Sequence, residues 1–130
     1  MRLEDNPIYI EDIEKIADQS FPWEKLANKT FLISGSTGMI GSFLIDVLMY
    51  RNKKYKMGCK IYALGRNEKK ARERFSAFWN NEQFALWSRT LIEHLNMTHM
   101  APLTIYFMLP AIHIRWHMQR IQSEQLLLTL

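Results

Sequence analysis

The alternation of apolar and polar positions predicts a strand and an amphipathic helix in the first half of the chain. The apolar run at residues 31–33 has the length and composition of a short buried strand. Apolar residues then recur with the spacing of one helical face, at Ile40, Phe43, Leu44, Val47 and Leu48. We expect this helix to end near Tyr50, where a basic loop would follow.

The same pattern predicts further helices and strands on both sides. A short helix is expected at residues 10–19, packed on the core through Trp23 and Leu26, and a second strand at residues 60–65. Asn67 then caps a helix with Glu68 in its first turn. That helix should bury Ala71, Phe75, Phe78 and Trp79 and expose Lys69, Arg72 and Arg74. A third strand is expected to begin at residues 90–93. The prediction is an α/β fold with a parallel sheet and flanking helices.

Three glycines lie between the first strand and its helix, at Gly35, Gly38 and Gly41. Gly35 allows the chain to reverse sharply after the strand. Gly38 would let the backbone approach a pyrophosphate closely, and Gly41 would let the helix lie against the sheet. The amino terminus of the helix then offers unpaired N–H groups and a positive dipole end to phosphates.

This arrangement of strand, glycine turn and helix predicts a dinucleotide-binding site. The spacing is G-x-x-G-x-x-G, and the alternative interpretation is an ordinary tight turn. A phosphate loop of the G-x-x-x-x-G-K-[ST] type is excluded, because no Lys-Ser or Lys-Thr pair follows Gly41.

Length and charge limit the functions that the chain can carry. Its 130 residues suffice for one small domain with a single core. The formal net charge is +4, and much of the excess lies at residues 51–60 and 69–74. A basic balance is compatible with nucleic-acid binding. We favour a solvated loop for the first of these stretches and expect no nucleic-acid partner.

The cysteine content and the hydropathy pattern bear on cellular location. A single cysteine, Cys59, excludes an internal disulfide framework and fits a reducing cytoplasm. The first 18 residues are too acidic and polar for a signal peptide. The most apolar stretch, residues 103–109, is far too short to span a membrane. We therefore expect a cytoplasmic protein without a membrane partner.

The end of the second strand bears on the choice of cofactor. An acidic side chain at this position binds the adenosine ribose and favours NAD. This chain has Gly65-Arg66-Asn67 instead. Arg66 would pair with a 2′-phosphate and favour NADP, stack beside the adenine, or lie exposed in a loop. NAD remains the first expectation, and the choice between the two cofactors stays open.

Residues 29–78 resemble the amino-terminal part of the NAD-dependent epimerase/dehydratase family, which belongs to the extended short-chain dehydrogenase/reductase superfamily. The segments at 31–41 and 61–67 carry this resemblance. It implies a Rossmann-type fold and a tightly held nicotinamide cofactor. It also implies that the cofactor-binding residues fall into two groups. The residues on the pyrophosphate side are Gly35, Thr37, Gly38, Met39 and Ile40, and Gly41 belongs to the same cofactor-binding turn. The residues on the adenosine side are Arg66 and Asn67.

The resemblance also implies an activity. Family members transiently oxidise a sugar carbon of a nucleotide sugar, so that epimerisation, dehydration or decarboxylation follows. Their catalytic pair is Tyr-x-x-x-Lys, in which the lysine lowers the tyrosine pKa. The only such spacing here is Tyr50 to Lys54, at the exit of the first helix, and we interpret it as coincidence. No catalytic residue is assigned, and the oligomeric state stays open.

The tail from about residue 101 has no counterpart in the family. Codons that encode residues 103–129 permit a shifted reading frame that contains an H-A-A-S run, like the segment that passes the cofactor in the family. We therefore expect an irregular or helical tail produced by a frameshift. The domain prediction is a helical extension at 1–28, the first part of a dinucleotide-binding domain at 29–100, and an aberrant tail at 101–130.

The histidines of the tail offer an alternative site. His113 and His117 have the i, i+4 spacing that binds a metal on a helix. No carboxylate or cysteine accompanies them at a suitable spacing, so no metal site is predicted. Three interpretations remain: the cofactor-binding part of a catalytically incomplete sugar-nucleotide enzyme, a stand-alone dinucleotide-binding module, and a fragment that does not fold.

Overall fold

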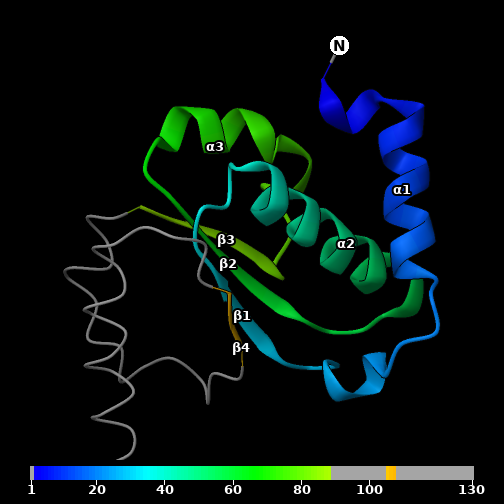
Figure 1. Cartoon of the computed structure of the whole chain (residues 1–130). Helices are drawn as coiled ribbons and strands as arrows, with labels where there is room; N and C mark the ends of the chain where they lie inside the picture. The colour runs from blue at the N-terminus through cyan, green and yellow to red at the C-terminus, as the bar shows by residue number, and fades with distance from the viewer. Residues whose placement is uncertain (1, 89–104, 108–130) are drawn as a thin grey trace, which may run out of the picture.

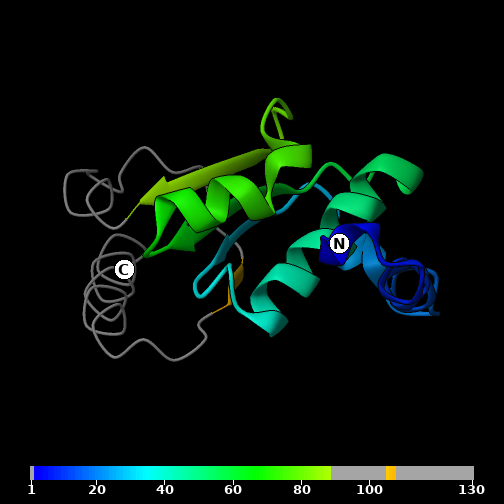
Figure 2. The ribbon, with the colours of Figure 1, turned by 90° about the horizontal axis from the view of Figure 1, so that it is seen from above.

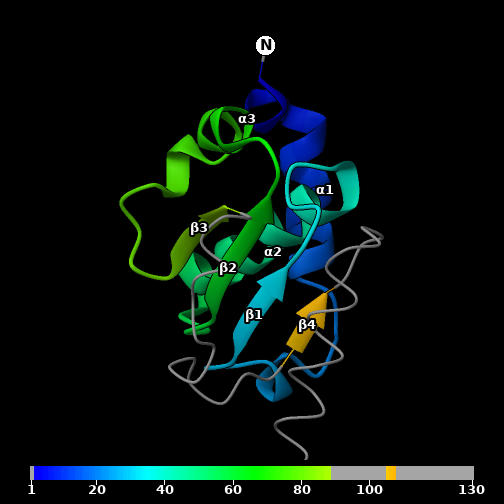
Figure 3. The same cartoon turned by 90° about the vertical axis from the view of Figure 1, so that its left-hand side faces the viewer.

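The protein is an α/β domain built on a parallel sheet. The computed structural model describes residues 2–88 and 105–107. The strands are β1 (Thr30–Ile33), β2 (Lys60–Gly65), β3 (Phe84–Ser88) and β4 (Ile105–Phe107), in the order β3-β2-β1-β4 (Figures 1 and 3). Every neighbouring pair is parallel. This architecture is compatible with a partial Rossmann-like fold.

The helices α1 (Pro7–Ala17), α2 (Met39–Tyr55) and α3 (Glu68–Arg74) all lie on one face of the sheet, with α2 between the other two (Figures 1 and 2). Short 3-10 helices occur at Leu3–Asp5, Trp23–Lys25 and Ser76–Phe78. The main core fills the space between sheet and helices, and its fully buried members include Phe31, Ile45, Leu48, Ile61 and Phe75. Burial of these side chains is the principal stabilising contribution.

Helix α1 begins at Pro7, three residues earlier than predicted. The Asn6 side chain accepts a hydrogen bond from the Ile8 amide, and Pro7 occupies the first helical turn, where its missing N–H group costs nothing. Ile13 and Ala17 pack against Val47 of α2 in a second, smaller core. Helix α1, within the segment predicted as an extension, therefore packs directly on α2.

The predicted end of α2 near Tyr50 is wrong, because the helix continues to Tyr55. Tertiary contacts hold its last turns. The Asn52 side chain bonds both the N–H and the C=O of Cys59, at 2.9 and 2.8 Å. Arg51 lies against the rings of Trp23 and Tyr55 and donates to the Ala17 carbonyl, which closes the end of α1. The basic stretch from residue 51 is thus partly helix surface and partly packed.

Strand β2 and the Asn67 cap of α3 are confirmed. The Asn67 side chain accepts a hydrogen bond from the Lys70 amide at 3.0 Å. The expected faces of this helix are partly wrong, since Trp79 is exposed and Arg74 is half-buried and paired with Asp46. Trp79 lies beyond the helix, which ends at Arg74.

The third strand lies at residues 84–88, earlier than the predicted start at residue 90, and residues 90–93 lie outside the described part of the chain. Residues 105–107 form β4 and pair with β1, with Phe31 opposite Ile105. The expectation of an irregular or helical tail is therefore wrong for these three residues. A run of three β-favouring apolar residues supplies the physical reason.

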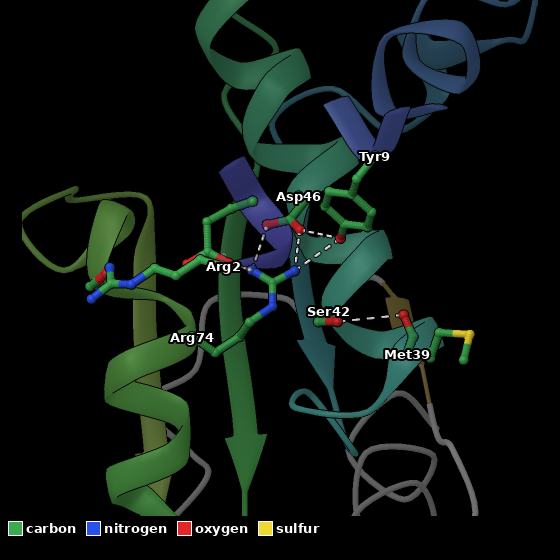
Figure 4. A network of polar contacts seen from close by, with 8 residues as sticks. Arg2, Tyr9, Met39, Ser42, Asp46 and Arg74 are labelled. Atoms are coloured by element: carbon green, nitrogen blue, oxygen red, sulfur yellow. Dashed lines mark hydrogen bonds and ion pairs between the residues drawn. The ribbon is translucent and has the colours of Figure 1, made fainter. Parts of the chain in front are cut away.

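One polar cluster ties the three helices together. Asp46 of α2 accepts hydrogen bonds from Tyr9 of α1 and from Arg74 of α3, and Arg74 also donates to the Tyr9 hydroxyl at 2.9 Å (Figure 4). Burial raises the pKa of Asp46, and the bonds from Arg74 and Tyr9 act in the opposite direction. We call Tyr9, Asp46 and Arg74 the interhelical cluster. Asp46 is buried, Arg74 is half-buried, and their hydrogen bonds join α1, α2 and α3.

No helix within the described part of the chain is long and apolar enough to cross a membrane.

Candidate functional site

The glycine turn follows β1 at its carboxyl end. Gly35 has a φ of 60°, which is in the left-handed region that glycine adopts without strain. Its carbonyl accepts a hydrogen bond from the Gly38 amide at 3.0 Å, which closes the turn before α2 begins. The turn therefore has the sharp reversal that was expected of Gly35.

Gly41 is required by the turn itself. A Cβ on Gly41 would lie 2.4 Å from the Gly35 carbonyl oxygen and 3.1 Å from the Ser36 Cα. The expectation that Gly41 lets the helix lie against the sheet is thus corrected: the close contact is between the first turn of α2 and the backbone of the glycine turn. A Cβ on Gly38 would approach the same oxygen to only 3.2 Å.

The amino terminus of α2 is open. Its cap residue is Gly38, which has no side chain to bond the N–H groups of the first turn. The side chains of Met39 and Ile40 are 87% and 63% exposed, so no described residue covers this end of the helix. The exposed position of Ile40 contradicts its predicted place on the buried face of the helix. The backbone amides here are the donors that a phosphate group needs.

The glycine turn packs against the end of β2. The Ser36 amide donates to the Leu64 carbonyl at 3.2 Å. A Cβ on Gly65 would lie 3.4 Å from the Ser36 Oγ and 4.0 Å from the Thr37 Cγ2. The structure thus packs Ser36 and Thr37 of the glycine turn against Gly65, the residue before Arg66 and Asn67. We call the contact of Ser36 and Thr37 with Leu64 and Gly65 the turn–strand junction.

Ser36 is a residue that sequence analysis did not single out. It is completely buried, and its Oγ has no hydrogen-bond partner among the described residues. A buried hydroxyl without a partner costs about 1–3 kcal/mol. Such a group calls for an explanation, and a ligand or a bound water would supply one. No pattern in the sequence marks it, because burial of this serine depends on β2 and α3.

The charged side chains near the junction differ in their pairing. Glu68 is bound by Arg72, whose Nη2 lies 2.7 Å from the Glu68 Oε1. Arg66 is exposed and makes no ion pair or hydrogen bond with any residue that the structure describes. Asn67 uses its side-chain oxygen to cap α3. Next to the junction, Arg66 therefore carries a positive charge that is unpaired within the described part of the chain.

The Tyr50–Lys54 pair lies on the last turns of α2. Tyr50 is about 16 Å along the helix axis from Met39, given a rise of 1.5 Å per residue. Lys54 binds the Asp18 carboxylate at 2.9 Å and Tyr50 packs in the smaller core. These contacts hold α1, and they leave the pair away from the glycine turn.

Metal binding finds no support within residues 2–88 and 105–107, where no group of three or more His, Cys, Asp or Glu side chains could hold an ion. The candidate pair His113 and His117 lies outside the described residues.

Comparison with known proteins adds no relative: no family model, no curated protein and no solved structure matches this chain.

Proposed function

We propose that this chain binds a nicotinamide dinucleotide through the glycine turn and the end of β2. The observation that carries the proposal is the uncapped amino terminus of α2, a helix of 17 residues that starts directly after the carboxyl end of β1. Such a terminus binds pyrophosphate through its free amides and its dipole. The groups assigned to the pyrophosphate are the backbone amides of Met39 and Ile40, beside Gly35, Thr37 and Gly38.

The order of the strands supports this placement. The chain leaves β1 toward β2 and β3 on one side, and β4 lies on the other side of β1. In open α/β sheets, ligands bind outside the carboxyl ends of the strands where the strand order reverses. In this chain that point is the carboxyl end of β1, where the glycine turn lies. The finer assignment of the fold as Rossmann-type belongs to this proposal.

The adenosine end of the cofactor belongs on the β2 side of the site. Arg66 and Asn67 follow this strand, and the turn–strand junction joins them to the pyrophosphate groups. We assign NAD or NADP to this site. When bound, it would supply hydride chemistry to a neighbouring substrate.

The wider role that we propose is that of the cofactor-binding, amino-terminal portion of a nucleotide-sugar epimerase, dehydratase or decarboxylase. The glycine spacing at 35–41 and the segment at 61–67 support it. The described residues contribute binding and orientation, and we assign no catalytic side chain among them. A nucleotide sugar would bind only in the presence of the remaining catalytic machinery.

Titration of the full chain with NADH and NADPH, followed by cofactor fluorescence, tests the proposal. We expect saturable binding. Gly38→Val should weaken it at least about tenfold, equivalent to about 1.4 kcal/mol, because a branched side chain would project into the pyrophosphate site. The backbone at Gly38 has a φ of −72°, which valine adopts readily, and its Cβ would lie 3.2 Å from the Gly35 carbonyl oxygen. A shift of the turn by a few tenths of an ångström accommodates this contact, so the variant should fold.

Circular dichroism of the wild type and of Gly38→Val controls for folding. A folded chain that binds neither cofactor would overturn the proposal, as would a folded Gly38→Val variant with unchanged affinity.

A further inference from the structure

Positive charge gathers at the end of the domain where β1 and β2 begin. The segments 23–30 and 51–60 meet there, and the Lys60 amide donates to the Lys29 carbonyl at 3.0 Å (Figure 1). Together they contain one carboxylate, Glu24, and seven cationic side chains. The cations are Lys25, Lys29, Arg51, Lys53, Lys54, Lys56 and Lys60. The fold thus brings two basic segments that are distant in the sequence to the same end of the domain.

Most of these cations have no ion pair. Lys54 binds the Asp18 carboxylate at 2.9 Å, and Arg51 donates to the Ala17 carbonyl at 2.9 Å. The other five make no ion pair with any residue that the structure describes. We call these five the basic end: Lys25, Lys29, Lys53, Lys56 and Lys60. Lys29 is half-buried, and the other four are exposed.

The negative end of the α2 dipole accounts for only part of this charge. Lys53 lies in the last turn of α2 and Lys56 follows the helix, where cations are stabilising. Lys25 lies in the 3-10 helix before β1, and Lys60 is the first residue of β2. Neither of these two lies at the end of an α-helix, so the dipole does not explain them. A negatively charged partner does.

A row of aromatic rings lies beside the basic end. The Arg51 guanidinium lies between the rings of Trp23 and Tyr55, 4.5 and 3.9 Å from their centroids. The Phe21 ring packs edge-on against Trp23, with 5.0 Å between centroids. Phe21 is 54% exposed and Tyr55 is 45% exposed. We call Phe21, Trp23, Arg51 and Tyr55 the aromatic row. Bases of single-stranded nucleic acids stack on such rings and on guanidinium planes.

This combination of lysines and rings favours a single-stranded nucleic acid over other anionic partners. Lysines neutralise backbone phosphates, and rings bind bases of any sequence. A membrane-binding surface buries a broad apolar face in the lipid. The exposed large apolar side chains within residues 19–30 and 51–60 are only Phe21 and Tyr55. An acidic peptide offers carboxylates to the lysines and no planar base to the rings.

We propose that the basic end and the aromatic row bind single-stranded nucleic acid without sequence preference. The lysines contact phosphates, and bases stack on Phe21 and Tyr55. This surface lies about 24 Å from the glycine turn along α2, counted from Met39 to Tyr55, so the inference goes beyond the proposed dinucleotide site. It replaces the expectation of no nucleic-acid partner, which rested on a solvated loop at residues 51–60, because α2 continues through the first half of that stretch.

Anisotropy of a fluorescently labelled oligouridylate, titrated with the full chain, tests this inference. We expect a dissociation constant of about 10⁻⁴ to 10⁻⁶ M at physiological salt. The logarithm of the affinity should fall with the logarithm of the salt concentration with a slope of about −3.5, as for five phosphate contacts on a single strand. Absence of binding, or a slope near zero, would overturn the inference and leave the dinucleotide site untouched.

The double variant Lys25→Gln, Lys60→Gln tests whether binding occurs at the basic end. Loss of two phosphate contacts should weaken binding about 25-fold at about 0.1 M salt and make the slope less negative by about 1.4. The matched control is Lys69→Gln, Lys70→Gln, which removes the same charge from exposed positions of α3 and should weaken binding less than about twofold. Equal weakening by the two double variants would show that net charge alone drives binding and would overturn the inference.

Phe21→Ala tests the contribution of the rings. Loss of one stacked base should weaken binding about fivefold or more and leave the salt slope unchanged. Ile8→Ala is the control, because Ile8 is also an exposed apolar residue, at 70%, and lies at the other end of α1. Circular dichroism of every variant checks that it folds. Unchanged affinity of a folded Phe21→Ala variant would contradict the proposed stacking.

Competition experiments separate the possible partners and sites. Saturating NADPH should not displace the oligouridylate, and displacement would place the nucleic acid at the glycine turn and overturn the inference. An oligoglutamate of equal charge that competes as well as unlabelled oligouridylate would assign the surface to acidic peptides. Tighter binding to phosphatidylserine vesicles than to oligouridylate would assign it to a membrane. Either of these results would also overturn the inference.

Discussion

The interhelical cluster and the turn–strand junction are both polar sites next to the core, and they differ in how their groups are satisfied. In the cluster, the buried carboxylate of Asp46 has two donors, and Arg74 joins α3 to α2 and α1. At the junction, the Ser36 hydroxyl is buried without a partner and Arg66 is unpaired among the described residues. The cluster joins three helices through paired groups, and the junction contains a buried hydroxyl without a partner among the described residues.

The two regions also differ in the parts of the chain that form them. The interhelical cluster joins three helices whose interface also contains the smaller apolar core around Ile13, Ala17 and Val47. The junction consists mainly of turn backbone, with glycine where side chains would collide. Substitutions in the cluster should therefore act on stability, and substitutions at the junction on cofactor affinity.

The largest expected effect follows from Arg74→Ala. Removal of this side chain leaves the buried Asp46 carboxylate without its cation, and a broken buried pair costs about 3 kcal/mol or more. Urea unfolding should show this loss of unfolding free energy. The control is Arg72→Ala, two residues earlier, whose exposed pair with Glu68 should contribute less than about 1 kcal/mol. Equal effects from both variants would contradict the assigned role of the cluster.

Gly41→Ala should affect stability and affinity together. The added Cβ would meet the Gly35 carbonyl oxygen at 2.4 Å, so the glycine turn must shift, at a cost of about 1–3 kcal/mol. Cofactor affinity should fall as well, because the same turn forms the pyrophosphate site. Gly65→Ala is the comparison, since its Cβ meets neighbours only at 3.4 Å or more. A Gly41→Ala variant as stable as wild type would show that the turn is looser than described.

Ser36→Ala should affect the free energy of unfolding and the cofactor affinity differently. Removal of a buried hydroxyl that has no partner in the free protein should leave the free energy of unfolding unchanged or raise it by up to about 1 kcal/mol. Dinucleotide affinity should fall, because the ligand or bound water beside the glycine turn would lose one hydrogen-bond partner. Thermal unfolding and fluorescence titration of the same preparation give both values. A large loss of stability would show that this hydroxyl is satisfied in the free protein.

The smallest expected effect is a change in the reaction rate of the Cys59 thiol, which measures how tightly the core around it is packed. Its thiol is buried and donates to the Leu26 carbonyl, and burial raises its pKa, so the reactive thiolate is scarce. We expect slow reaction with a thiol-specific reagent in native protein and fast reaction in urea. Arg74→Ala should accelerate native labelling, and Ser36→Ala should not. Fast labelling of the folded wild type would contradict the packing around this residue.

Local signals in the sequence predicted the elements that depend on neighbours along the chain. Strand β2 and the Asn67 cap are of this kind, because apolar runs and capping side chains act within a few residues. The sharp turn at Gly35 followed from glycine spacing in the same way.

The features that the sequence did not reveal depend on contacts between distant residues. Arg74 seemed an exposed residue on a helix face, yet its partners Asp46 and Tyr9 lie 28 and 65 positions away. The last turns of α2 persist because Asn52 binds the backbone of Cys59. Ser36 escaped notice because its isolation arises only when the turn packs on the end of β2. Each case is a tertiary contact that overrides a local pattern.

Mapping of amide chemical shifts in the labelled full chain, with and without NADPH, tests the dinucleotide site most directly. We expect shifts concentrated at residues 35–41 and 64–67, with little change in α1 or in the last turns of α2. Shifts centred elsewhere, or none at saturating NADPH with a well-dispersed spectrum, would contradict the site.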